Sequence, residues 1–130
     1  KAIRNPDYRT YLSSRNLCLA TPYSPSAPFN VGAAMGRNRL IYTLADYAIV
    51  IASDFEKGGT WAGAIEALKA KWLPVFALQH KHMPLGNTKL IERGAIPFPY
   101  PFEGHYSELQ AWLYTHSPHP NEDTEQLSLF

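Results

Sequence analysis

Residues 47–52 have the sequence YAIVIA, the strongest apolar run of the chain. A short run that is apolar throughout predicts a strand of a parallel sheet, which helices cover on both faces. Outward from this run, further apolar segments predict strands at residues 17–20, 73–78 and 95–98. Helical spacing of apolar residues predicts helices at residues 5–15, 33–45, 60–71, 86–93 and 106–115. This alternation of strands and helices predicts an α/β fold with a mainly parallel sheet.

The composition of the chain limits the kinds of protein it can be. It has 130 residues, of which 45% are apolar and 18% charged, as in one folded globular domain. No apolar run approaches the roughly 18–20 residues of a membrane span, so we expect no transmembrane segment. The single cysteine, Cys18, forms no internal disulfide and fits the reducing cytoplasm. Because Cys18 falls in the expected strand at residues 17–20, we expect it in the core.

The net charge of +1 is unevenly distributed along the chain. Residues 1–40 hold six basic residues and one acidic residue, a net charge of +5. Residues 103–130 hold five acidic residues and no Lys or Arg, a net charge of −5. A basic segment favours an anionic partner such as nucleic acid, although ordinary surface charge gives the same pattern.

The last part of the chain differs from the rest. We expect a folded domain at residues 1–115 and a tail at residues 116–130. Residues 116–125 are polar and contain prolines, which predicts a flexible linker. The chain then becomes apolar again in Gln126-Leu127-Ser128-Leu129-Phe130. Such an end predicts a short motif that docks into another protein, the alternative being that it folds back onto its own domain.

A glycine-rich turn follows the central strand, where α/β sheets commonly bind ligands. Its paired glycines allow close approach of a ligand, and the following helix offers free N–H groups to an anion. We therefore predict phosphate binding by Lys57, Gly58, Gly59 and Thr60. The spacing is not that of a P-loop or of GxGxxG. The alternative is a purely structural turn in which Thr60 is the helix N-cap.

A second candidate site lies where a proline-rich loop meets a helix. Arg37, Asn38 and Arg39 are predicted to contact phosphate, because the guanidinium fork suits phosphate oxygens. The two arginines lie on different faces of a helix, so we expect that one contacts ligand while the other pairs internally. The alternative is a solvated helix face. Tyr23 and Phe29 in the loop are candidates for stacking on bases.

The sequence shows no pattern that indicates catalysis. His80 and His82 lack acidic or cysteine partners at ligand spacing, so we expect no metal site. No Ser-His-Asp set is present, and Asp54 and Glu56 are the only carboxylates beside the glycine turn. We expect no cofactor and no catalytic residue.

Three motifs follow one another along the chain: GRNRLI at 36–41, KGGTWAGA at 57–64 and GNTKLIERGA at 86–95. The apolar segments AIVI at 48–51 and VFA at 75–77 lie between them. In this order they resemble the Rossmann-like domain of the DNA-processing protein A (DprA, also called Smf) family, with its RNR and GNxxLIxxGA signatures. The resemblance implies a Rossmann-like three-layer fold.

The chain also departs from this family's pattern. Residues 78–80, LQH, stand where the family has Pro-Gly, and the glycine turn is KGG rather than SGS. The family's first half, with its SGxAxGID segment, is missing. We therefore expect a divergent member, of which this chain is the C-terminal part of a larger Rossmann-like domain.

The resemblance implies a role in DNA uptake and recombination. Family members bind single-stranded DNA without sequence preference, act as homodimers and load the RecA recombinase during natural transformation, and they are not catalysts. The basic first forty residues and the glycine turn are compatible with binding a phosphate backbone.

A second group of the same superfamily gives an alternative function. The lysine-decarboxylase-like (LOG) nucleotide hydrolases are similar in a Met and Arg on a helix, an aspartate at its end and a glycine pair, here Met35, Arg37, Asp46 and Gly58-Gly59. The catalytic glutamate of their pattern is out of register, because Glu66 lies one position beyond it. A nucleotide-binding protein or nucleoside-monophosphate hydrolase remains the alternative.

The end of the tail carries a separate resemblance. The sequence QLSLF at 126–130 is similar to the peptide by which bacterial replication and repair proteins bind the DNA polymerase sliding clamp. This resemblance implies the clamp as a partner.

Overall fold

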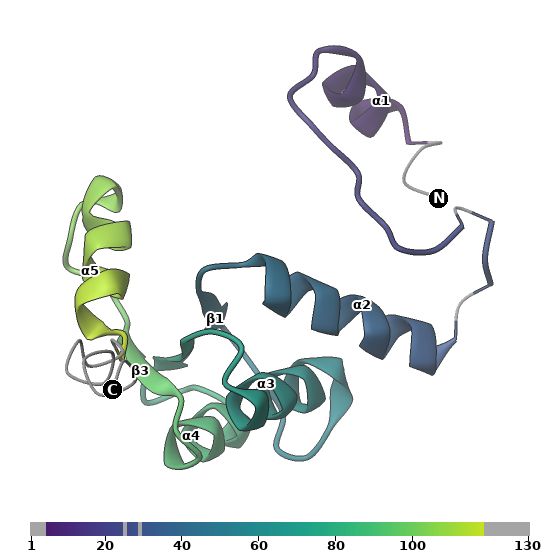
Figure 1. The fold of residues 1–130 in the computed structure, drawn as a ribbon. Coiled ribbons are helices and arrows are strands. Elements are labelled where there is room, and N and C mark those ends of the chain that lie inside the picture. The colour runs from purple at the N-terminus through teal and green to yellow at the C-terminus, as the bar shows by residue number, and fades with distance from the viewer. Residues whose placement is uncertain (1–4, 25, 29, 119–130) are drawn as a thin grey trace, which may run out of the picture.

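The computed structural model describes residues 5–24, 26–28 and 30–118. Its elements are α1 (Pro6–Ser13), α2 (Val31–Leu44), β1 (Ala48–Val50), α3 (Gly58–Ala70), β2 (Val75–Gln79), α4 (Leu85–Glu92), β3 (Ile96–Pro99), the 3-10 helix η2 (Tyr106–Glu108) and α5 (Leu109–His116). The three strands form one sheet in the order β1-β2-β3, and both pairs of neighbours are parallel (Figure 1). The expected α/β class with a parallel sheet is confirmed.

The two faces of the sheet carry separate halves of the core. Side chains alternate between the faces of a strand, so neighbouring residues of β2 point in opposite directions. Val75 and Ala77 pack with buried residues of α3 and α4, whereas Phe76 and Leu78 pack with α5. Helices therefore cover both faces, as in a three-layer Rossmann-like fold. The three tryptophans pack against these two clusters: Trp61, Trp72 and Trp112.

Strand β1 is shorter than the apolar run that predicted it. Its ladder with β2 ends at Val50, which pairs with Ala77, and Ile51 is already 59% exposed. The carbonyl of Ile51 accepts a hydrogen bond from Asn87 Nδ2 at 2.9 Å instead of joining the sheet. The chain therefore leaves the sheet at Ile51 and turns toward the start of α4.

The expected strand at residues 17–20 is wrong. These residues form no strand, Leu19 is 43% exposed, and Cys18 is exposed rather than in the core. No described strand pairs with the segment, and an apolar run of four residues needs such a partner to become a strand. The helix before it is present: Asn5 caps α1 by accepting a hydrogen bond from the Asp7 N–H. Figure 1 shows α1 set apart from the sheet.

Helix boundaries differ from the expected ones where local hydrogen bonds decide them. Helix α2 begins at Val31, because Asn30 Oδ1 accepts a hydrogen bond from Ala33 N at 2.7 Å. The linker was expected from residue 116, but His116 belongs to α5 and the buried Ser117 donates to Leu113 O at 2.7 Å. The rest of the expected linker from residue 119 and the motif at 126–130 lie outside the described residues.

Candidate functional site

Asn87 joins the carboxyl ends of two strands to the start of α4. Its side chain is 1% exposed, and its Oδ1 accepts a hydrogen bond from Ser53 N at 2.8 Å. Its Nδ2 donates to Ile51 O and to Leu78 O, both at 2.9 Å. The sequence prediction quoted Asn87 as part of a motif but gave it no role. Its position beside Gly86 at the start of a helix was the available signal.

Gly86 allows α4 to approach the turn that follows β1. A Cβ at this position would lie 2.6 Å from the carbonyl carbon of Ser53 and 2.7 Å from that of Asp54. Both obstacles are backbone atoms, which cannot rotate away. Gly86 and Asn87, which we call the GN pair, therefore both hold the turn at residues 52–54 against α4.

This turn forms one wall of a hollow at the carboxyl edge of the sheet. The hollow has a volume of about 220 Å³. We call it the carboxyl-edge hollow, and its lining residues are Ala52, Ser53, Asp54, Lys57, Gly58, Thr60 and Pro84. Three of the four predicted phosphate-binding residues of the glycine turn line it, and Gly59 does not.

The amino end of α3 opens into this hollow. The N-cap residue of α3 is Lys57 rather than Thr60. The Lys57 side chain makes no capping hydrogen bond. Gly58 adopts a φ of +75°, a conformation that residues with a side chain rarely take. Because no side chain among the described residues caps the helix, the N–H groups of its first turn remain available to an anion.

The side chains of Arg37, Asn38 and Arg39 differ in their contacts. Asn38 Nδ2 donates to Gly59 O at 3.4 Å, which links α2 to the glycine turn. Arg39 pairs with Glu66 of α3, with its Nε 3.1 Å from Glu66 Oε1. Arg37 is exposed and has no ion-pair partner among the described residues. The expectation that one arginine pairs internally is confirmed for Arg39.

Close packing of α2 on α3 holds these groups in place. A Cβ on Gly63 would lie 2.9 Å from Tyr42 Cε2, so the glycine lets the ring of Tyr42 lie against α3. Burial raises the pKa of the Tyr42 hydroxyl above its ordinary value of 10.0. The neutral ring therefore acts as an apolar spacer between the two helices.

Arg37 lines a second hollow, of about 270 Å³, between the proline-rich loop and α2. Tyr23 lies in the same wall, with its hydroxyl against Gly36. We call this the loop hollow, and its lining residues are Thr21, Tyr23, Ser24, Ala27, Pro28, Asn30, Ala33, Ala34 and Arg37. Phe29, the other candidate for stacking, lies outside the described residues. The predicted residues thus fall at two hollows rather than one, and Asn38 connects α2 with the glycine turn.

The described residues contain no group of three or more His, Cys, Asp or Glu side chains placed to hold a metal ion. The rings of His80 and His82 lie with their centroids 5.3 Å apart, and His80 also meets Tyr100 edge to face. Within residues 5–24, 26–28 and 30–118, no helix has the length and apolar character to cross a membrane.

The family model for DNA recombination-mediator protein A matches residues 3–103. The chain belongs to the DNA recombination-mediator protein A family. The resemblance seen in the sequence is confirmed, and the match extends beyond the motifs at residues 36–95 to α1 and to the segment after β3. Membership in the DNA recombination-mediator protein A family places the chain in DNA processing and recombination. No curated protein sequence and no solved structure matches it significantly.

Proposed function

We propose that this chain binds single-stranded DNA without sequence preference, in the bacterial cytoplasm, as part of DNA uptake and recombination. The observation that carries the proposal is the uncapped amino end of α3, which opens with Lys57 into the carboxyl-edge hollow. Backbone N–H groups and a lysine recognise a phosphate whatever base it carries, which suits binding without sequence preference.

Charge and aromatic groups support the same interface. Arg37 is exposed at the loop hollow beside Tyr23, so a phosphate contact and a stacked base have neighbouring places there. Asp54 also lines the carboxyl-edge hollow and repels phosphate. We therefore place the phosphate at Lys57 and the first turn of α3, away from the Asp54 carboxylate.

Removing Lys57 or Arg37 is expected to weaken binding to an oligothymidine in a mobility-shift assay over a salt series. Each lost phosphate contact is expected to reduce the steepness of the plot of log binding constant against log salt concentration by about 0.7. At 0.1 M salt this corresponds to a roughly fivefold loss of affinity. Lys69→Ala, at the other end of α3, is the matched control for Lys57→Ala. Arg39→Ala is the control for Arg37→Ala, because Arg39 already pairs with Glu66.

The proposal fails if the chain binds no single-stranded DNA at low salt, or binds it with no salt dependence. It also fails if Lys57→Ala and Lys69→Ala behave alike and Arg37→Ala matches Arg39→Ala. In that case ordinary surface charge, rather than the two hollows, accounts for the binding.

A hydrolase function has less support from the geometry. Glu66, the carboxylate nearest to the hydrolase pattern, pairs with Arg39 between α2 and α3 and does not line the carboxyl-edge hollow. Incubating the full chain with nucleoside monophosphates tests this alternative, since release of free base that disappears in Glu66→Ala would favour the hydrolase. We propose a binding protein without a catalytic residue.

Protein partners follow from the same role. We propose a homodimer that delivers single-stranded DNA to a RecA-type recombinase. Ile41 and Leu44 share a face of α2 and are 57% and 77% exposed, which supports association through apolar surface.

The motif at residues 126–130 is proposed to bind the DNA polymerase sliding clamp. Deleting these five residues is expected to abolish capture of the full chain on an immobilised clamp, because the apolar side chains of the motif would carry the contact. Neutralising Glu122, Asp123 and Glu125 leaves the motif intact, and this control variant should still bind. Capture of the deleted chain at the original affinity would refute the motif.

A further inference from the structure

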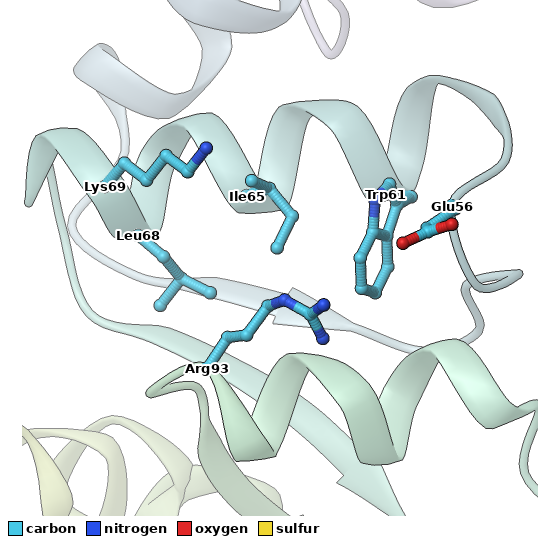
Figure 2. A pocket seen from close by; sticks show the side chains of 6 residues that line it. All are labelled: Glu56, Trp61, Ile65, Leu68, Lys69 and Arg93. Carbon is cyan, nitrogen blue, oxygen red and sulfur yellow. The ribbon is translucent and has the colours of Figure 1, made fainter.

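A pocket with an apolar floor and a charged rim lies between α3 and the end of α4 (Figure 2). Its volume is about 440 Å³. We call it the α3–α4 pocket, and its lining residues are Glu56, Trp61, Ile65, Leu68, Lys69 and Arg93. Trp61, Ile65 and Leu68 recur at helical spacing on α3, and Figure 2 shows Arg93 reaching toward them from α4. The DNA interface proposed above uses none of these side chains.

The cations at the rim have no carboxylate partners among the described residues. The Arg93 guanidinium lies over the rings of Trp61 and Phe55, 5.1 and 5.6 Å from their centroids, and its Nη1 donates to Lys89 O at 3.1 Å. Lys69 is exposed and makes no ion pair in the described part of the chain. Two such cations beside an apolar floor fit a segment that carries both acidic and apolar side chains.

The end of the described chain lies beside the α3–α4 pocket. Another hollow, of about 580 Å³, adjoins the α3–α4 pocket and shares Leu68 and Arg93 with it. Its lining also includes Lys71 and Pro118, the last described residue. The tail therefore starts beside the cationic end of the α3–α4 pocket.

We propose that residues 122–130 dock into the α3–α4 pocket of their own chain. The acidic residues come first along the tail and would meet the cations near its start. The apolar residues follow and would reach the floor. Twelve residues span at most roughly 40 Å, and the thirteen residues of α3 only about 20 Å, so the length suffices. The pairs are Glu122, Asp123 and Glu125 with Lys69 and Lys71, and Leu127, Leu129 and Phe130 with Trp61, Ile65 and Leu68.

The order of charges sets the direction in which the tail lies. Glu56 stands at the Trp61 end of the pocket, away from Lys71, and it repels an acidic segment. The uncharged residues 126–130 suit that end. A tail held in this way competes with any other protein for residues 126–130, at an effective concentration in the millimolar range. The proposal is independent of the DNA interface.

Disulfide trapping in the full chain tests the docking, because Cys18 is the only native cysteine. In a Cys18→Ser background, Ser128→Cys is combined with Ile65→Cys in the pocket or, as the control, with Tyr106→Cys on η2, a position that is 85% exposed and lines neither the pocket nor the adjoining hollow. The intramolecular bond is expected to form at least about tenfold faster in the pocket pair, because docking raises the local concentration of the two thiols. Leu68→Cys is a second pocket position, should Ile65→Cys fail to fold.

Charge reversal provides the specific control. Lys69→Glu is expected to slow the pocket cross-link several-fold. Lys81 lines neither the α3–α4 pocket nor the adjoining hollow, so Lys81→Glu should leave the rate of this cross-link unchanged. An excess of the synthetic peptide 119–130 should also slow it. Equal rates for the pocket and control pairs would overturn the proposal. So would a cross-link that forms only between two chains, or one that is indifferent to Lys69→Glu.

Discussion

Asn87→Ala is expected to lower the free energy of unfolding by about 3 kcal/mol or more, one of the largest effects of any single substitution in this chain. The reason is the number of buried groups that depend on one side chain. The substitution leaves the buried Ser53 N–H and Leu78 C=O, and the partly buried Ile51 C=O, without this partner. Each unsatisfied buried group costs about 1–3 kcal/mol.

Urea unfolding of the full chain, followed by circular dichroism, measures this loss. Asn38→Ala is the matched control, because Asn38 is half-buried and makes one long hydrogen bond, to Gly59 O at 3.4 Å. Its loss should stay below about 1 kcal/mol. Equal losses for the two variants would mean that Asn87 does not hold the strand ends together.

Asn87→Asp separates hydrogen bonding from side-chain volume. Aspartate keeps an oxygen for Ser53 N–H but no longer donates to Ile51 O and Leu78 O. It also places a carboxylate at a position that is 1% exposed, which is costly without a charged partner. We therefore expect Asn87→Asp to be at least as unstable as Asn87→Ala at pH 7. A stability near that of the wild-type chain would show that volume alone matters here.

The sequence predicted those parts of the fold that depend on local pattern. Apolar periodicity is a local property, and it correctly indicated the order of helices and strands from α2 to α5. It failed at residues 17–20, because four apolar residues do not reveal whether a neighbouring strand is present. The exposed Cys18 is the direct consequence.

The candidate site depended more on contacts between distant residues. The pairing of Arg39 with Glu66 joins positions 27 apart in the sequence, so helix-face reasoning indicated only that one arginine would pair internally. The role of Asn87 was missed for a similar reason, since its partners follow two different strands. Phosphate binding by Lys57, Gly58 and Thr60 stays a prediction, although the structure places these three at one hollow.

Gly86→Ala is expected to destabilise the chain by about 2 kcal/mol or more, even though alanine favours a helix more than glycine does. The added methyl group would overlap the backbone of Ser53 and Asp54. Relief requires α4 to move away from the turn at residues 52–54. That movement lengthens the hydrogen bond from Ser53 N–H to Asn87 and opens the wall of the carboxyl-edge hollow.

Gly32→Ala is the matched control, because Gly32 lies in the first turn of α2 and, among the described residues, its added Cβ would meet only Asn30 Oδ1, at 3.4 Å. This control should be neutral or stabilising by up to about 1 kcal/mol. If Gly86→Ala behaved like Gly32→Ala, the close approach of α4 to the turn would be contradicted.

The double variant Gly86→Ala, Asn87→Ala decides whether the two residues act together. Neighbouring residues that support one contact lose less in combination than the sum of their separate losses. Once Gly86→Ala has moved α4 away, the hydrogen bonds of Asn87 are already weakened, so removing them costs less. We therefore expect the loss in the double variant to fall short of the sum by about 1 kcal/mol or more, measured by urea unfolding. Additive losses would mean that the GN pair stabilises the turn through two independent contacts.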